Sequence, residues 1–190
     1  MQDDLFKRIA VPWILDAEGG FVNEASDRGG ATKYGISIKF LRLLPDHDGD
    51  GFVDGDLDRD GDVDIEDIQG LDVEDAIDLY HQYFWLSYKC AAFNNPAIAL
   101  CLFDAVVNHR PKTAKILLQR GLGVTADGDI GPRTMRAAQE INADIFLPQY
   151  FSFRAKLFHD IVKRHSNQDV YFRGWLRRLF LLQQYIYLEI

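Results

Sequence analysis

The acidic side chains of this chain gather in one segment, which limits where that segment can lie in a fold. Residues 46–78 hold fifteen acids and one base, Arg59, so the segment carries a formal charge of −14 in a chain of −8. The rest of the chain is therefore mildly basic, at +6. Carboxylates at this density repel one another and are costly to bury. The sequence thus describes a mildly basic body with one very acidic insert.

The spacing of these acids predicts a metal site. In the second half of the segment, oxygen ligands fall at the positions of a twelve-residue calcium loop. The predicted ligands are Asp56, Asp58, Asp60, Asp62 (through its carbonyl), Asp64 and Asp67, with Gly61 at the sharp turn. Because position 12 is Asp instead of Glu, the loop resembles those of dockerins. The hard oxygen donors favour Ca²⁺ over zinc.

The first half of the segment begins in the same way but ends differently. Its predicted ligands are Asp46, Asp48, Asp50, Phe52 (through its carbonyl) and Asp54. Leu57 stands at position 12, so this loop must close in another way, for which Asp56 is the candidate. We expect one or two Ca²⁺ ions with a structural role; the alternative is a solvated acidic loop.

Composition excludes several classes of protein. At 47% hydrophobic residues the chain can form a substantial core, which excludes wholesale disorder. No apolar run approaches the roughly 20 residues that span a bilayer, and the acidic N-terminus is unlike a secretory signal. Cys90 and Cys101 are too few for a disulfide scaffold, so we expect buried free thiols.

Hydrophobic periodicity predicts a mainly α fold. A helix from Phe6 to Ala17 carries Pro12, which must kink it or mark a boundary, and it ends at Gly19-Gly20. Residues 21–38 are rich in glycine and polar residues and predict loops with a small β-hairpin. Further helices are predicted after Asp72, over 97–107, over 111–121, from Pro132, and over 143–164 and 170–188. Because 97–107 is apolar on nearly every side, it is the predicted central helix.

Two carboxylates flank the glycine-rich stretch after the first helix. Glu18 ends the helix, where the helix dipole disfavours a second negative charge; in an apolar site this would favour its protonated form. Asp27 follows in a loop that can fold back toward it, and Thr32 lies five residues further on. Glu18 is thus a candidate general acid, and Asp27 and Thr32 are candidates to position a water. The alternative is a helix end with ordinary surface carboxylates.

The stretch from Glu18-Gly-Gly-Phe-Val-Asn to Asp27-Arg-Gly-Gly-Ala-Thr32-Lys-Tyr-Gly-Ile resembles the signature of glycoside hydrolase family 108. The segment Tyr80-His-Gln-Tyr-Phe-Trp85 is similar to another part of that family. The resemblance implies a lysozyme-like fold and an N-acetylmuramidase that cleaves the β-1,4 bond between N-acetylmuramic acid and N-acetylglucosamine. It assigns general acid catalysis to Glu18, with water positioned by Asp27 and Thr32.

The second half of the chain resembles a peptidoglycan-binding module. The resemblance rests on Leu117-Leu-Gln119-Arg-Gly and on Asp127-Gly-Asp-Ile-Gly131-Pro132-Arg-Thr134; a purely structural turn is the alternative. We therefore expect a lysozyme-like catalytic region over 1–92, with the calcium insert at 46–67. A helical peptidoglycan-binding-like region over 93–190 would pack with it as one monomeric globular body.

Three further residues are candidates for substrate contacts. Tyr34 follows Thr32 in the signature stretch, Asn108 ends the central helix, and Trp85 could stack on a sugar ring. Core packing is the alternative for Trp85, and a satisfied buried network is the alternative for Asp104 and Asn108, which lie four apart on the central helix.

The expected partner is peptidoglycan, with no nucleic acid and no membrane insertion. The resemblance suggests a phage endolysin that is made in the host cytoplasm without a signal peptide, is released by a holin-type route, and lyses the cell. Two alternatives stay open. A lytic transglycosylase would need one acid but no activated water, and a calcium-dependent peptidoglycan-binding module would not catalyse at all.

Overall fold

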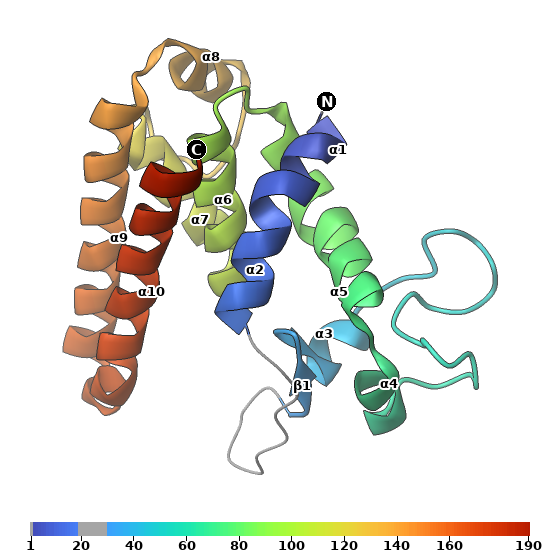
Figure 1. The fold of residues 1–190 in the computed structure, drawn as a ribbon. Coiled ribbons are helices and arrows are strands. Elements are labelled where there is room, and N and C mark those ends of the chain that lie inside the picture. Colours follow the sequence, from blue (N-terminus) through green and yellow to red (C-terminus); the bar gives the residue numbers. More distant parts are fainter. Residues whose placement is uncertain (1, 19–29) are drawn as a thin grey trace. The chain divides into compact units, whose positions relative to one another are not determined.

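The computed structural model describes residues 2–18 and 30–190. The α-helices are α1 (Gln2–Leu5), α2 (Val11–Glu18), α3 (Ile38–Leu41), α4 (Ile65–Gly70), α5 (Val73–Tyr80), α6 (Pro96–Asn108), α7 (Pro111–Gly121), α8 (Pro132–Glu140), α9 (Ala143–Arg164) and α10 (Asp169–Glu189). Shorter helical segments of other types are η1 (Phe6–Ala10), η2 (His81–Leu86), η3 (Cys90–Ala92) and η4 (Ser166–Gln168). Strands β1 (Thr32–Lys33) and β2 (Ile36–Ser37) form an antiparallel hairpin (Figure 1). The predicted mainly α, lysozyme-like fold with a small hairpin is confirmed.

The chain divides into two compact units. The larger unit comprises Met1–Ile14 and His81–Ile190, and the smaller unit comprises Leu15–Tyr80. Helix α2 contributes its first half to the larger unit and its second half to the smaller one.

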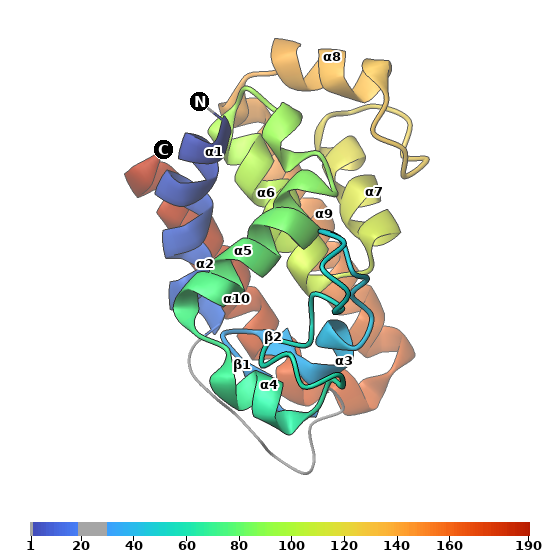
Figure 2. The ribbon, with the colours of Figure 1, turned by 90° about the vertical axis from the view of Figure 1, so that its right-hand side faces the viewer.

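The larger unit is built around α6. Every residue of this helix from Ala97 to Val106 is buried, which confirms the predicted central helix. Its start follows from local chemistry, because Asn95 Oδ1 accepts hydrogen bonds from the backbone N–H groups of Ala97 and Ile98, and Pro96 occupies the first turn. Helix α7 packs on α6, and α9 packs on both α7 and α10. Figures 1 and 2 show α9 and α10 side by side.

A buried ion cluster lies inside the larger unit. The carboxylate of Asp104 is fully buried and pairs with the guanidinium groups of Arg154 and Arg178, the latter at 2.8 Å. The indole Nε1 of Trp13 donates to Asp104 Oδ1 at 2.9 Å. Burial raises the pKa of Asp104, but the two guanidinium groups outweigh burial and hold that pKa at about 2. A buried polar network around Asp104 is present as predicted, but Asn108, its other predicted member, is exposed and donates to the Asp104 carbonyl from the end of α6.

The N-terminal helical stretch changes its winding just before Pro12. Residues Phe6–Ala10 form a π-helical segment, and α2 continues from Val11. Proline lacks a backbone N–H and crowds the carbonyl four residues earlier, so a break in regular α-helical bonding next to it is expected. The predicted boundary at Pro12 is therefore a change of helix type.

The smaller unit combines the hairpin with three short helices (Figure 2). Ser37 caps α3 by accepting a hydrogen bond from the N–H of Phe40. Asp72 Oδ1 accepts from the N–H groups of Glu74 and Asp75, as predicted for the start of α5. The side chains of Leu41, Ile68, Leu71 and Ala76 are buried and form the core of this unit.

Two composition-based predictions are also met. Cys90 and Cys101 are buried free thiols, and burial raises the pKa of both. Over residues 2–18 and 30–190, no helix has both the length and the hydropathy that a bilayer crossing requires.

Candidate active site

Glu18 is the last residue of α2, and its side chain lies against the turn of the hairpin. It is half-buried. A Cβ atom placed on Gly35 would lie 2.7 Å from Cγ and 2.8 Å from Oε2 of Glu18. The volume that any other residue would fill at position 35 is therefore occupied by the Glu18 carboxylate.

The hairpin turn is shaped to allow this approach. Thr32 pairs with Ser37 and Lys33 pairs with Ile36, so Tyr34 and Gly35 form a two-residue turn. Both have positive φ, 50° for Tyr34 and 77° for Gly35, which is the backbone that tight hairpins with the favoured twist require. Glycine adopts it without strain, and tyrosine does so only at some cost.

Tyr80, the last residue of α5, holds the turn in place. Its side chain is 1% exposed, and its hydroxyl donates to the carbonyl oxygen of Tyr34 at 2.9 Å. A Cβ atom on Gly35 would lie 2.5 Å from the same hydroxyl oxygen. The end of α2, the hairpin turn and the end of α5 therefore meet at Gly35, within the smaller unit.

Thr32 opens β1 and is half-buried. Its hydroxyl donates to the carbonyl oxygen of Gly30 at 3.2 Å. With its proton committed to the backbone, the hydroxyl oxygen keeps lone pairs that can accept a hydrogen bond from a water. Asp27, the second predicted carboxylate, lies outside the described residues.

The three residues predicted to contact substrate differ in their exposure to solvent. Tyr34 is half-buried in the turn beside Glu18, and the ammonium group of Lys33 lies 5.7 Å from its ring. Asn108 is exposed at the end of α6 in the larger unit, where its Nδ2 donates to the Asp104 carbonyl at 2.8 Å.

The substrate role predicted for Trp85 needs correction. Its side chain is 1% exposed in the larger unit, where its ring packs at 5.4 Å from Phe6 and 5.7 Å from Phe103. A ring enclosed in this way has no face left for a sugar. Trp85 packs in the core, which was the alternative.

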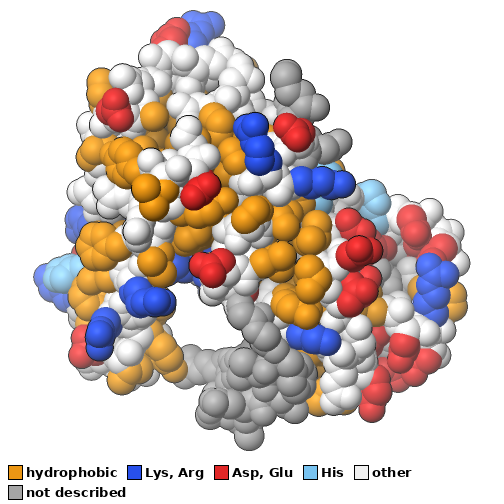
Figure 3. Space-filling view, in the orientation of Figure 1, with side chains coloured by type: hydrophobic (Ala, Val, Ile, Leu, Met, Phe, Trp, Pro, Cys, Tyr) orange, Lys and Arg blue, Asp and Glu red, His pale blue; other side chains and the backbone are white. Residues whose placement is uncertain are grey.

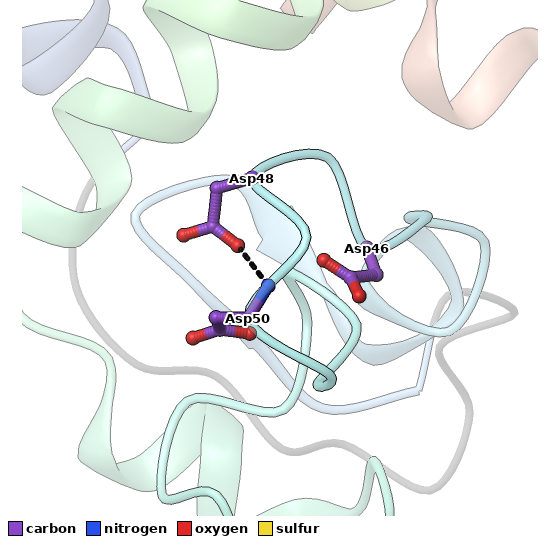
Figure 4. Close-up of side chains that lie close together, drawn as sticks. All are labelled: Asp46, Asp48 and Asp50. Carbon is purple, nitrogen blue, oxygen red and sulfur yellow. Dashed lines mark hydrogen bonds between the residues drawn. The ribbon is translucent and has the colours of Figure 1, made fainter.

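The acidic segment forms two carboxylate clusters. The carboxylates of Asp46, Asp48 and Asp50 lie within 4.8 Å of one another, and so do those of Asp56, Asp58 and Asp60. Figure 4 shows the first cluster, where Asp48 Oδ1 accepts from the N–H of Asp50 at 3.1 Å. Figure 3 shows acidic side chains crowded over the segment between α3 and α4.

The two loops repeat the same hydrogen bonds ten residues apart. The aspartate at position 1 (Asp46 or Asp56) accepts from the N–H of the position-6 glycine, Gly51 or Gly61. These two glycines have φ of 97° and 101°. Arg59 in the second loop pairs with Asp50 in the first at 2.9 Å. The sequence-based prediction that both loops begin alike is confirmed in their backbone geometry.

The remaining predicted ligands lie outside these two clusters. Asp54 Oδ1 accepts from the N–H of His47, and Asp64 caps α4 by accepting from the N–H of Glu66. Asp67 is 2% exposed and accepts from the N–H groups of Leu57, at 2.6 Å, and Asp64, at 2.7 Å. Through its bond with Leu57, Asp67 links the end of the second loop to its start.

Crowding of negative charges and burial raise the pKa of two carboxyl groups in these loops. Burial and then the neighbouring carboxylates raise the pKa of Asp58. The carboxylate of Asp60, followed by burial, raises the pKa of Asp62. A bound cation would relieve this repulsion.

The motif Asp127 to Thr134 forms a rigid turn organised by Gln119. The buried Gln119 Nε2 donates to Asp127 Oδ1 at 2.7 Å and to the carbonyl oxygen of Asp129 at 2.9 Å. Its Oε1 accepts from the N–H of Gly128 at 2.8 Å. In the sequence, Gln119 was noted only as part of the stretch that resembles a peptidoglycan-binding module, and this structural role was not predicted.

Sequence reasoning also missed the roles of Gly35 and Tyr80. Both stood in the stretches that resemble the hydrolase family, but only the folded structure brings them to Glu18. The Tyr34-Gly35 pair between two short β-like pieces was the available signal, because such a pair suits a tight hairpin turn.

Two family models match this chain, one in its first half and one in its second half. A family model described as "Glycosyl hydrolase 108" matches residues 11–109. One described as "Predicted Peptidoglycan domain" matches residues 113–180. No curated protein gives a significant match.

Among solved structures, one titled "Structure of Brucella abortus SagA" is similar to this chain. The TM-score is 0.74 at 22% sequence identity, and the match covers 100% of this chain and 97% of that chain. At this identity the likeness shows the fold. The first family model covers more than half of the chain, and this protein therefore belongs to the glycosyl hydrolase 108 family, as a glycoside hydrolase that acts on peptidoglycan.

Proposed function

We propose that this protein is an N-acetylmuramidase that cleaves the β-1,4 bond between N-acetylmuramic acid and N-acetylglucosamine and so lyses bacterial cells. Glu18 is the general acid, and Asp27 and Thr32 position the attacking water. The observation that carries the proposal is the placement of the Glu18 carboxylate at the end of α2, against Gly35 and beside Tyr80.

The surroundings of Glu18 suit an acid whose position must be fixed. The side chain is half-buried and is confined by the Tyr34-Gly35 turn, which Tyr80 holds through a hydrogen bond of 2.9 Å. The geometry of an acid relative to the leaving oxygen decides much of its effect on the rate. A carboxyl group that is held by three elements of one compact unit is preorganised for proton transfer.

The proposed reaction follows from these roles. Glu18 donates its proton to the glycosidic oxygen, and the bond from that oxygen to C1 of the muramic acid residue breaks. The attacking water donates one proton to the Asp27 carboxylate while its oxygen forms the new bond to C1. Thr32 Oγ1, whose proton goes to the Gly30 carbonyl, accepts the water's second hydrogen.

The decisive experiment digests purified peptidoglycan and analyses the products by mass spectrometry. Glu18→Gln keeps the shape of the side chain but removes the acid, and we expect it to release no muropeptides above background. Asp16→Asn is the matched control, since it neutralises an exposed carboxylate on the same helix, and we expect wild-type release.

The products separate the proposal from its rivals. Hydrolysis leaves reducing muramic acid ends, whereas a lytic transglycosylase leaves 1,6-anhydromuramic ends. A non-catalytic binding module would bind sacculi and release nothing. Wild-type activity in Glu18→Gln would reject the assignment of the acid.

We further propose that the loops at 46–67 bind one or two Ca²⁺ ions with a structural role. Support comes from the two clusters of three carboxylates, whose oxygens lie within 4.8 Å of one another, and from the glycine turn in each loop. At an effective dielectric near 20, two carboxylates about 4 Å apart repel by about 4 kcal/mol. Six-to-eightfold oxygen coordination by carboxylates and carbonyls is the chemistry that Ca²⁺ prefers.

A further inference from the structure

A small polar cavity lies within the larger unit, and its lining residues belong neither to the proposed catalytic site nor to the proposed calcium loops. Its volume is about 280 Å³. The lining residues are Ser87, Tyr88, Lys89, Lys115, Asp129, Ile130 and Gly131. They come from the turn between η2 and η3, from α7, and from the turn that leads into α8.

Two lysines give the cavity a net positive charge. Lys89 is exposed and Lys115 is half-buried, and neither forms an ion pair with any residue in the described part of the chain. The ammonium group of Lys115 lies 5.9 Å from the ring of Tyr88, a cation–π contact that limits where the group can move. One carboxylate, Asp129, lines the cavity against these two cations.

The wall of the cavity is formed before any ligand arrives. Gln119 donates to the carbonyl of Asp129 and accepts from the N–H of Gly128, and the N–H of Gly131 donates to the Asp129 carbonyl at 3.1 Å. The opposite wall is fixed at Lys89, which adopts φ 60° and donates its N–H to the Leu86 carbonyl at 3.0 Å. Rigid walls lower the entropy cost of binding.

We infer that this cavity binds a carboxylate of the peptide stem of peptidoglycan. The charges match an anionic group and not a neutral sugar. The volume falls just below the range of about 300–1,000 Å³ that is usual for drug-sized ligands, so it suits one short acidic residue and not a disaccharide. The inference rests on peptidoglycan as the proposed substrate and adds a site for its peptide stem.

Calorimetric titration of the full-length protein tests this with a defined probe. The probe is the tripeptide L-alanyl-γ-D-glutamyl-meso-diaminopimelate, and the comparison is its fully amidated counterpart, which keeps both amino groups but has no carboxylate. Lys115→Gln should weaken binding of the acidic tripeptide about tenfold, the size expected for one charge-assisted hydrogen bond. Lys163→Gln, which removes an exposed lysine of α9 outside the cavity, should bind as wild type does.

A second variant separates binding from folding. Lys89→Gly removes the ammonium group and places glycine where φ is 60°, a conformation that glycine adopts without strain. We expect the melting temperature to hold or rise while tripeptide affinity falls about tenfold. A merely structural role for Lys89 would not produce this combination.

Each failure has its own signature. Equal affinity for the acidic and amidated tripeptides, no binding of either, or equal affinity in Lys115→Gln and Lys163→Gln would overturn the inference. The proposed muramidase activity is judged separately, from the products of peptidoglycan digestion by wild type and Glu18→Gln. Glu18→Gln should bind the tripeptide as wild type does, so a lost activity and a lost stem site are distinguishable.

Discussion

Glu18 and Gly35 approach so closely that position 35 has no room for a side chain. A Cβ atom on Gly35 would lie 2.8 Å from the carboxylate oxygen Oε2 of Glu18, a distance that real Cβ atoms do not show. The absence of a side chain at one residue thus sets the position of the proposed catalytic acid. Replacing that glycine should disturb catalysis by moving the acid, while the chemical identity of every proposed catalytic group is unchanged.

Gly35→Ala is therefore expected to lower the rate of muropeptide release by about a hundredfold. The added methyl group would clash with the Tyr80 hydroxyl and with the Glu18 side chain, so both must move, and a shift of about 1 Å in a catalytic group costs on the order of 10²-fold. Initial rates on purified peptidoglycan measure the effect.

Two glycines give matched controls for this substitution. Gly123 has φ of 68° with nothing near its Cβ position, so Gly123→Ala carries the backbone strain without the clash. Gly70 has neither feature, so Gly70→Ala is expected to be close to neutral. If Gly35→Ala were as active as Gly123→Ala, the clash with Glu18 would not control catalysis.

Tyr80→Phe should lower the free energy of unfolding by about 1–3 kcal/mol. The variant removes the hydroxyl that donates to the Tyr34 carbonyl inside a buried site, and a buried acceptor that loses its donor costs about this much. Urea denaturation measures the change. Tyr187→Phe alters an exposed tyrosine and should change stability by less than about 0.5 kcal/mol; a similar value for Tyr80→Phe would contradict the role given to its hydroxyl.

Local signals in the sequence located many of the helices. Helix α7 runs from Pro111 to Gly121 and α9 from Ala143 to Arg164, at the predicted ends. Proline in a first turn and a capping side chain act within a few residues, so they can be read without a fold. The carboxylate clusters at 46–50 and 56–60 were predictable for the same reason, because each aspartate lies two residues from the next.

Contacts between distant residues could not be predicted in this way. The pairing of Asp104 with Arg154 and Arg178 depends on how α6, α9 and α10 pack, and no local pattern specifies that. The burial of Trp85 likewise depends on Phe6 and Phe103, which are far from it in the sequence. The approach of Glu18 to Gly35 requires α2, the hairpin and α5 together.

Removing calcium is expected to lower the melting temperature, and adding Ca²⁺ back should restore it. The clustered carboxylates repel one another without a cation, so an ion bound to the proposed sites would stabilise the folded state by mass action. Thermal unfolding in EDTA, and again in excess Ca²⁺, measures this. Magnesium at the same concentration should restore less, because it favours a smaller octahedral site.

Variants assign the effect to one loop or both. Asp58→Asn should reduce the calcium-dependent shift from the second loop, and Asp48→Asn that from the first. Asp78→Asn, which removes an exposed carboxylate of α5 outside both clusters, should keep the full shift. A melting temperature that responds neither to EDTA nor to Ca²⁺ would reject the metal site.

Arg154→Met should destabilise the protein by about 3–5 kcal/mol. Its guanidinium is fully buried with Asp104, and breaking one side of a buried ion pair leaves charge that water cannot reach. The exposed pair Lys156–Asp160 gives the contrast, since Lys156→Gln should cost about 0.5 kcal/mol or less. Equal losses in the two variants, measured by urea denaturation, would show that burial does not govern the Asp104 pair.

His109 should make stability depend on pH below neutrality. Burial, and then the positive charge of Arg154, lower the pKa of this imidazole from 6.5 to about 4. The unfolded chain therefore binds a proton that the folded chain does not bind between these two values. The free energy of unfolding therefore has its full value above about pH 6.5 and falls as the pH drops toward 4.

His109→Gln removes this dependence, because glutamine does not titrate. Between pH 7.5 and 4.5 wild type should lose about 2–3 kcal/mol more of its free energy of unfolding than the variant, given about 1.36 kcal/mol per pKa unit. His159→Gln changes an exposed imidazole and should follow wild type at every pH. Urea denaturation at pH 7.5, 6.0 and 4.5 gives the comparison, and parallel losses in wild type and His109→Gln would show that His109 does not cause the pH dependence.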